Sequence, residues 1–300
     1  MKLIDSTIGK KNKLFDHKML IFDKIKELKK ELEKYRKEGK VIGFVPTMGA
    51  LHKGHLSLIK KAKDENDLVV ASIFVNPTQF NNPSDLKNYP RTPEMDNRLL
   101  NDSKVDIVFS PPVEEIYSSK DNQKNILLPR ALADVMEGSF RPGHFKGVVQ
   151  IVSKLFDIVK PQKAYFGEKD FQQLSIIRFM VHTLNLPVEI IACPTVREKS
   201  GLALSSRNLK LSVIGKVNAV EISKALIFAK DNWKKFTPPL LKEKVFKMIE
   251  ADGKLKVEYI EIADEATLEV SKNWDQYKHV RCFAAVYCKE VRLIDNVRLF

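Results

Sequence analysis

The chain has 300 residues, of which 44% are hydrophobic and 30% are charged. These fractions are typical of a globular protein with a sizeable core, and they exclude fibrous and wholly disordered classes. No run of roughly 18 uncharged apolar residues occurs, so the sequence predicts no helix that spans a membrane. The three cysteines lack a Cys-x-x-Cys spacing, which argues against a structural zinc site and favours a reducing, cytoplasmic compartment.

The net charge of +13 at pH 7 raises the question of a polyanionic partner. The excess is spread along the chain, and over residues 22–37 lysines alternate with glutamates, as on a solvated helix face. Aromatic side chains are not set among the basic ones in the manner of nucleic-acid-binding proteins. We therefore expect no nucleic-acid partner and interpret the charge as that of an ordinary lysine-rich surface. A small anionic substrate is equally compatible with this charge.

Residues 1–19 are polar and aperiodic, and we expect them to form a flexible extension. Apolar residues at three- and four-residue spacing then predict a helix from Ile21 to Tyr35, ended by Gly39. Beyond it, short apolar runs alternate with amphipathic segments. The runs predict strands at 41–45, 68–75, 106–110, 164–166 and 188–192, and the segments predict helices at 54–66, 148–159 and 171–184.

This alternation indicates an α/β fold with a doubly wound, mainly parallel, Rossmann-like sheet. After about residue 205 the pattern changes. Two helices, at 217–233 and 240–251, precede strands at 256–262 and 280–287. We therefore predict a flexible extension (1–19), a Rossmann-like domain (20–204) and a small α+β domain (205–300).

The segment from Pro46 to His55 lies where the first strand of this alternation meets a helix. Ligands of open parallel sheets bind at this edge, against helix N-termini that carry partial positive charge. His52 and His55 face the same way on the first helical turn, and Gly54 has no Cβ to block a phosphate. The pair indicates a polyphosphate site; alternatively, these are two surface histidines, or zinc ligands that lack a third partner.

Two further polar segments follow later strands, at 167–170 and 204–208. Lys169 could reach a phosphate as a point charge, and Asp170 could cap the helix or contact a ribose hydroxyl. The hydroxyls before Arg207, with its guanidinium, form a natural phosphate clamp. Each segment alone could be a polar turn or a helix cap, but three such segments at sheet ends together favour a phosphate site.

Gln79, just past the second buried strand of this alternation, and Gln173, one helical turn after Lys169, are candidates of another kind. An amide both donates and accepts hydrogen bonds, so it can bind a hydroxyl or carboxylate without adding charge. A purely structural role is the alternative for each glutamine.

Six ordered motifs closely resemble those of the pantoate–beta-alanine ligase family, from about residue 20 to the C-terminus. The His-x-Gly-His pair alone indicates only the wider nucleotidyltransferase superfamily. The motifs are Pro46-Thr47-Met48-Gly49 with His52-Lys53-Gly54-His55, Phe74-Val75-Asn76-Pro77-Thr78-Gln79-Phe80, Tyr89-Pro90-Arg91-Thr92, Arg141-Pro142-Gly143-His144-Phe145, Phe166-Gly167-Glu168-Lys169-Asp170-Phe171-Gln172-Gln173 and Ser205-Ser206-Arg207-Asn208.

The resemblance implies that ATP, pantoate and β-alanine give pantothenate, AMP and pyrophosphate through pantoyl adenylate. It implies that Gln79 and Gln173, in the substrate site for pantoate and β-alanine, hold pantoate. It also implies a homodimer that uses Mg²⁺, for which Asp96 is the candidate ligand. The implied catalytic residues are His55, His52, Lys169 and Arg207, and the implied ATP site comprises Pro46, Thr47, Met48, Gly49, His52, Gly54, His55, Gly167, Lys169, Asp170, Val196, Leu204, Ser205, Ser206 and Arg207.

Two other functions stay open at this point. One is a different adenylating enzyme or nucleotidyltransferase of the same superfamily, and the other is a basic RNA-binding protein with an inactive nucleotide fold. For the enzyme interpretation, we expect the small domain to close over the site and keep water from the adenylate.

Overall fold

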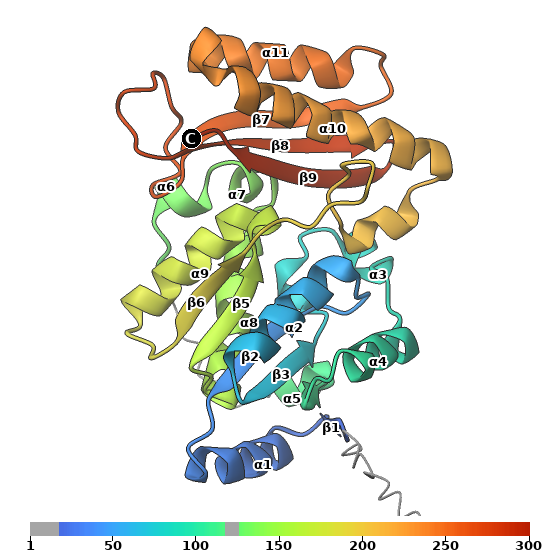
Figure 1. The fold of residues 1–300 in the computed structure, drawn as a ribbon, viewed down its shortest axis with the longest axis vertical. Helices are drawn as coiled ribbons and strands as arrows, with labels where there is room; N and C mark the ends of the chain where they lie inside the picture. The colour runs from blue at the N-terminus through green and yellow to red at the C-terminus, as the bar shows by residue number, and fades with distance from the viewer. Residues whose placement is uncertain (1–17, 118–125) are drawn as a thin grey trace, which may run out of the picture.

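The computed structural model describes residues 18–117 and 126–300, and Figure 1 shows a larger body that carries a smaller one along one edge. The predicted residues 1–17 of the extension lie outside the described residues. The strands of the larger body are β1 (Leu20–Phe22), β2 (Ile42–Thr47), β3 (Leu68–Ile73), β4 (Ile107–Phe109), β5 (Lys163–Gly167) and β6 (Glu189–Cys193). Its helices are α1 (Ile25–Lys37), α2 (Lys53–Glu65), α3 (Pro83–Lys87), α4 (Pro93–Asp102), α5 (Val113–Ile116), α6 (Arg130–Ala133), α7 (Glu137–Phe140), α8 (His144–Val159) and α9 (Phe171–Thr183).

The six strands form one parallel sheet in the order β1-β4-β3-β2-β5-β6. The chain runs from β2 outward through β3 to β4, then returns to place β5 on the other side of β2. The winding therefore reverses between β2 and β5, which confirms the predicted doubly wound α/β fold. In such sheets the carboxyl ends of the two strands at the reversal leave a crevice in which ligands bind.

The prediction of a helix from Ile21 was wrong at its start. Residues 20–22 form β1, which pairs with β4 at the sheet edge, and α1 begins only at Ile25. The apolar residues of β1 continue the helical spacing of α1 by coincidence, so periodicity alone could not separate the two elements.

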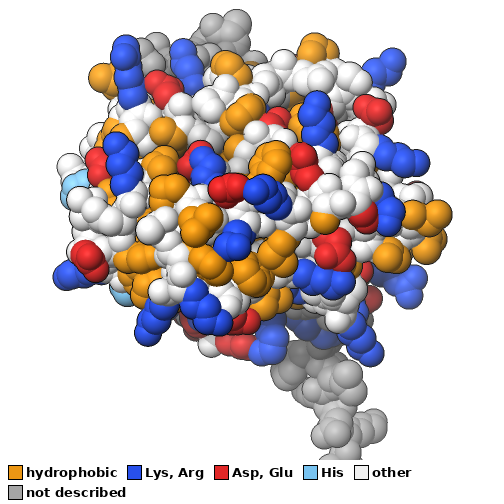
Figure 2. Space-filling model, turned by 90° about the horizontal axis from the view of Figure 1, so that it is seen from above, with side chains coloured by type: hydrophobic (Ala, Val, Ile, Leu, Met, Phe, Trp, Pro, Cys, Tyr) orange, Lys and Arg blue, Asp and Glu red, His pale blue; other side chains and the backbone are white. Residues whose placement is uncertain are grey.

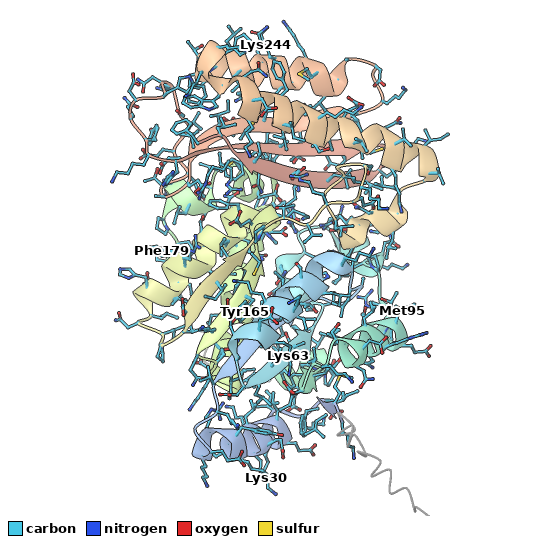
Figure 3. All side chains as sticks on the ribbon, viewed as in Figure 1. Lys30, Lys63, Met95, Tyr165, Phe179 and Lys244 are labelled. Carbon is cyan, nitrogen blue, oxygen red and sulfur yellow. The ribbon has the colours of Figure 1, made fainter. Side chains whose placement is uncertain are left out.

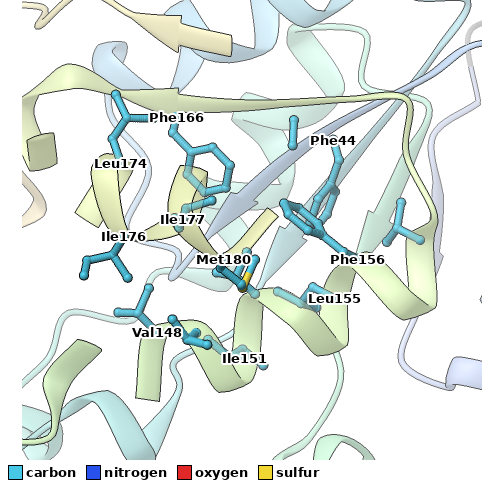
Figure 4. Packing of buried hydrophobic residues seen from close by; sticks show 14 of the residues in the cluster. Phe44, Val148, Ile151, Leu155, Phe156, Phe166, Leu174, Ile176, Ile177 and Met180 are labelled. Atoms are coloured by element: carbon cyan, nitrogen blue, oxygen red, sulfur yellow. The ribbon is translucent and has the colours of Figure 1, made fainter. Parts of the chain in front are cut away.

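Helices α8 and α9 pack on the sheet and build the main core, part of which is seen in Figure 4. Phe156 of α8 meets Phe44 of β2 and Phe166 of β5 edge to face, with ring centroids 6.3 and 6.5 Å apart. Burying a side chain of this size stabilises the fold by about 1.5–3 kcal/mol. Since β2 and β5 flank the reversal of the winding, this packing fixes the two strands whose ends form the crevice.

The smaller body consists of two helices packed on a three-stranded antiparallel sheet in the order β7-β8-β9. The prediction of two helices and two strands here was right, but it missed the last strand. The elements are α10 (Val213–Asn232), α11 (Pro238–Glu250), β7 (Lys256–Asp264), β8 (Val280–Cys288) and β9 (Val291–Arg298).

Figure 2, seen from above Figure 1, shows basic side chains scattered among acidic and hydrophobic ones.

The two bodies meet through buried polar contacts. Arg292 of β9 donates two hydrogen bonds to the carboxylate of Glu137 in α7, at 2.7 and 2.9 Å. The hydroxyl of Tyr259 in β7 donates to the same carboxylate at 2.9 Å. The small body therefore lies against the larger one beside the helices that cover the sheet (Figures 1 and 3). Over the described residues, no helix is long and apolar enough to cross a membrane.

Candidate active site

A cavity of about 210 Å³ lies where β2 and β5 end, at the reversal of the winding. All the residues predicted for the site line this cavity except Gly49 and Asp96. The loop after β2, the turn after β5 and the segment 204–207 thus come together in one place. The structure joins three stretches that lie far apart in the sequence.

His52 and His55 form the N-terminus of α2 by capping each other. The Nδ1 atom of His52 accepts a hydrogen bond from the Gly54 backbone N–H at 3.1 Å, and Nδ1 of His55 accepts from the His52 N–H at 3.3 Å. Because each Nδ1 accepts, the proton of each neutral imidazole belongs on Nε2. The ring centroids are 4.1 Å apart, so the site holds two neighbouring Nε2–H donors.

Both imidazoles are neutral at pH 7. Burial, with the nearby Lys169 charge adding to it, lowers the pKa of His52 from 6.5 to about 4. Burial, followed by the proximity of His52 and Lys169, lowers the pKa of His55 to about 3. Desolvation is the larger cause in each case, because a charged imidazole loses its hydration inside the fold. The two groups therefore act as neutral hydrogen-bond donors in this cavity.

Gly54 has a structural role in addition to the predicted one. A Cβ at this position would lie 2.8 Å from Cε1 and 2.9 Å from Nδ1 of His52. Such a Cβ would push the His52 ring off the helix terminus. The absence of a side chain at Gly54 thus keeps the capping imidazole in place, in addition to leaving space for a ligand.

Asp96 supports the loop after β2 and does not line the cavity. Its carboxylate, only 1% exposed, accepts hydrogen bonds from the backbone N–H groups of Ala50 and Leu51 at 2.9 and 2.7 Å, and from the Thr92 hydroxyl at 3.1 Å. These contacts occupy both carboxylate oxygens. They do not fit the magnesium ligand that the sequence suggests, and among the described residues no cluster of three acidic, histidine or cysteine side chains could hold a metal.

Lys169 and Arg207 supply the positive charge of the cavity. Lys169, in η2 (Glu168–Asp170), is mostly buried and lies 3.3 Å from the carboxylate of Asp170. Arg207, in η3 (Ser206–Lys210), donates to the carboxylate of Asp85 in α3 at 2.8 Å. Asp85 thus orients the guanidinium from outside the predicted motifs, and no sequence signal singled it out.

Ser206 joins two parts of the site. Its hydroxyl donates to the backbone carbonyl of Ala50 at 3.0 Å, which ties η3 to the loop that precedes α2. Ser205 caps η3 by accepting from the Arg207 N–H at 3.2 Å. Val196 and Leu204 lie opposite each other, and the Leu204 N–H donates to the Val196 carbonyl at 3.0 Å. The segment 204–207 is therefore fixed to the loop after β2 by a hydrogen bond to the backbone of that loop.

Gln79 lies in η1 (Pro77–Gln79), the turn after β3, and is 8% exposed. The turn touches α8 at Gly147, where a Cβ would lie only 2.3 Å from the Thr78 carbonyl oxygen. Asn76 orients the amide, because its Nδ2 donates to Gln79 Oε1 at 3.1 Å. Gln173, in the first turn of α9, lines the same cavity.

The apolar wall of the cavity was not predicted from the sequence. It is formed mainly by α8, which contributes Val148, Ile151, Val152 and Leu155. The apolar periodicity of this segment predicted a helix but gave no reason to place it beside a ligand. The wall excludes water from one side of a site whose other side carries the polar groups.

A doubly wound sheet with paired imidazoles and two cationic side chains at its reversal defines a nucleotide-binding α/β enzyme. The family model described as pantoate-beta-alanine ligase matches residues 20–298. The chain is 50% identical over 280 residues to the pantothenate synthetase of Porphyromonas gingivalis, covering 93% of this chain and 99% of that protein. It is 51% identical over 282 residues to the one from Phocaeicola vulgatus, with coverage of 93% and 99%.

Solved structures agree with these sequence matches. The pantothenate synthetase from Thermus thermophilus superposes with a TM-score of 0.88 at 39% identity, covering 94% of this chain and 100% of that one. The pantoate-beta-alanine ligase from Francisella tularensis, complexed with beta-gamma ATP and beta-alanine, gives a TM-score of 0.77 at 40% identity, with coverage of 93% and 97%. The chain belongs to the pantoate–beta-alanine ligase family.

Proposed function

We propose that this chain joins pantoate to β-alanine, using ATP and releasing AMP and pyrophosphate. Family membership supports the overall reaction. The observation that carries the assignment to this cavity is the meeting of three separate segments, each suited to phosphate, at the reversal of the sheet. The ATP and β-alanine named for the Francisella tularensis structure are substrates of the same reaction.

In the first half-reaction, a pantoate carboxylate oxygen attacks the α-phosphorus of ATP, and the bond to pyrophosphate breaks. Negative charge grows on the phosphate oxygens as this bond breaks, so catalysis depends on alignment and on donors placed in advance. His52 and His55 offer Nε2–H donors, while Lys169 and Arg207 offer full positive charges. Neutral imidazoles suit this role, because each ring can donate its Nε2–H to a phosphate oxygen without first taking up a proton. Each Nδ1 meanwhile keeps the backbone hydrogen bond that it accepts.

In the second half-reaction, the amine of β-alanine attacks the acyl carbon of pantoyl adenylate. The acyl–oxygen bond to AMP breaks as the amide bond forms, and the β-alanine nitrogen, which carries three protons as an ammonium, loses one to become the attacking amine and a second on forming the amide. Gln79 and Gln173 are the groups we assign to pantoate, since they line the cavity close to both the loop after β2 and the turn after β5. The apolar wall of α8 would limit the water that could hydrolyse the adenylate.

We also propose that the enzyme is a cytoplasmic homodimer that acts with Mg²⁺. Family resemblance supports the dimer and the metal, and three free, buried cysteines are consistent with a reducing compartment. Sedimentation velocity would report the dimer directly. A single species with the mass of one chain, at the concentration used for activity, would contradict it.

The decisive experiment is exchange of labelled pyrophosphate into ATP. We expect exchange only when pantoate is present, because the adenylate forms by attack of its carboxylate. Addition of β-alanine should then yield pantothenate and AMP in equal amounts. Exchange with another carboxylic acid but not with pantoate would favour a different adenylating enzyme, and salt-dependent RNA binding without exchange would favour a binding protein.

A further inference from the structure

Asn296, in β9 of the small body, reaches the turn that carries Lys169. Its side chain is 4% exposed, and its Nδ2 donates to the backbone carbonyls of Glu168 and Lys169 at 3.0 and 2.8 Å. One amide group thus binds two successive carbonyls of η2. No residue of the large body holds this turn in a comparable way among the contacts of the described residues.

The orientation of the Asn296 amide is fixed by Arg281 of β8. The Arg281 Nη1 donates to Asn296 Oδ1 at 2.5 Å. A guanidinium is a donor only, so the amide oxygen must face it and the NH₂ must face the turn. Arg281 is 3% exposed, and its guanidinium also lies over the ring of Phe171 at 4.1 Å. The amide is therefore held in a buried, fully bonded position.

Asp295, the residue before Asn296 on β9, contacts another part of the cavity edge. Asp295 accepts two hydrogen bonds from the guanidinium of Arg197, at 2.6 and 2.8 Å. Arg197 follows Val196, which lines the cavity. Two successive residues of β9 thus contact two separate stretches of the cavity edge.

A short 3-10 turn makes few hydrogen bonds of its own, so outside contacts set its direction. Lys169 extends from this turn on a long, flexible stem. A small tilt of the turn would therefore displace the ammonium group by more than it displaces the backbone. Whatever fixes the two carbonyls also fixes where the charge of Lys169 lies.

We propose that Asn296 is a positioning residue for adenylate formation, which acts by holding η2 so that Lys169 faces the phosphates of ATP. This inference rests on the phosphate-binding role proposed for Lys169. By this inference the small body contributes to the first half-reaction, in addition to excluding water from pantoyl adenylate.

The test is the Asn296→Asp variant, which has nearly the same shape and retains an oxygen toward Arg281. It replaces the donating NH₂ by an oxygen that faces two carbonyls. We expect pyrophosphate exchange to fall by about tenfold to a hundredfold, the scale of a misplaced catalytic group. The KM for ATP should rise, while the KM for β-alanine should stay unchanged.

Asn232→Asp is the matched control. Asn232 lies at the end of α10, donates from Nδ2 to the Phe228 carbonyl at 2.9 Å, and accepts from Lys235 at 2.8 Å. The same substitution there removes the same kinds of bond within the small body, away from the cavity. It should leave pyrophosphate exchange at the wild-type rate.

The role through Lys169 is tested by combining Asn296→Asp with Lys169→Met. We expect Asn296→Asp to cause no further loss in the Lys169→Met background, because the group that it positions is gone. If the double variant instead loses pyrophosphate exchange by the product of the two single losses, the inference is overturned. Normal exchange by Lys169→Met alone would instead overturn the proposed role of Lys169.

Asn296→Ala keeps the proposal falsifiable if the aspartate variant does not fold. The alanine variant carries no oxygen against the two carbonyls, and it should fold with a weaker but still Lys169-dependent loss of exchange. Full activity in the folded alanine variant would contradict a positioning role. Failure of both variants to fold, with a folded Asn232→Asp, would assign Asn296 to structure alone and also overturn the proposal.

Discussion

His55 is a partly buried donor of the site, and its imidazole is held by the N–H of His52 in the tautomer that leaves Nε2–H available. We expect His55→Ala to lower kcat by about 10²–10³, as the loss of one preorganised donor to a developing charge does. Steady-state kinetics would measure the loss. His182→Ala, at the exposed end of α9, is the control, and turnover close to wild type in His55→Ala would remove His55 from the mechanism.

A third histidine, His144, is also buried and neutral. Its Nδ1–H donates to the Gln79 carbonyl at 2.9 Å, and its Nε2 faces the Arg141 guanidinium at 3.2 Å. Burial, together with the Arg141 charge, lowers the pKa of His144 to about 4, although Glu137 and Asp170 act in the opposite direction. Protonation would place two donors against each other.

These three histidines make stability depend on pH. The unfolded chain binds their protons near pH 6.5, whereas the folded chain binds them only near pH 3 to 4. Between these values the unfolded state carries more protons, so the free energy of unfolding falls as pH falls from 6.5 toward 4. Urea unfolding at several pH values would measure the slope, and His144→Gln should make it shallower. An unchanged slope in that variant would show that His144 is not buried neutral.

At the scale of elements, helix α4 is the support of the loop before α2. The Asp96 carboxylate accepts from two successive backbone N–H groups of that loop, Ala50 and Leu51. Asp96→Asn would set an NH₂ against one of them, at a cost of about 1–3 kcal/mol for an unsatisfied buried group. We expect lower thermal stability and weaker ATP binding, with no change in the Mg²⁺ concentration that gives half-maximal activity.

The magnesium titration separates the two roles of Asp96. Asp102→Asn, at the exposed end of the same helix, controls for the loss of one acidic charge on α4. A rise of about tenfold or more in the Mg²⁺ requirement of Asp96→Asn, with unchanged stability, would restore the metal-ligand assignment and refute the role in holding the loop.

The sequence predicted the sheet because buried strands and amphipathic helices leave distinct periodicities, and it predicted the cavity residues because they belong to recognisable motifs. It did not predict β9, whose residues Val291 to Arg298 alternate between the core of the small body and contacts with the large one. Nor did it predict that Asp85 orients Arg207 or that Asn296 holds η2. These pairs are brought together only by tertiary packing, for which one sequence carries no local signal.

At the scale of the whole molecule, the ion pair between Arg292 and Glu137 joins the two bodies. Burial alone would raise the pKa of Glu137, but the hydrogen bonds and charge of Arg292 outweigh it and lower the pKa to about 2. Glu258 of β7 also accepts from Arg292, at 2.8 Å. Removing Arg292 alone would leave the buried carboxylate of Glu137 without its cation, so the informative variant is Glu137→Gln with Arg292→Met; the Glu258 side chain, 14% exposed, keeps access to water.

This double variant should loosen the small body from the edge of the sheet, and hydrogen exchange in residues 280–300 should become faster. If the small body keeps water from pantoyl adenylate, some adenylate will then hydrolyse before β-alanine reacts. The variant should therefore release more AMP than it forms pantothenate, whereas the wild type and the control Lys242→Met, which breaks the Lys242–Glu261 ion pair within the small body, should release equal amounts. Equal amounts from the loosened variant would mean that water is excluded by the large body alone, with the apolar face of α8 as the barrier.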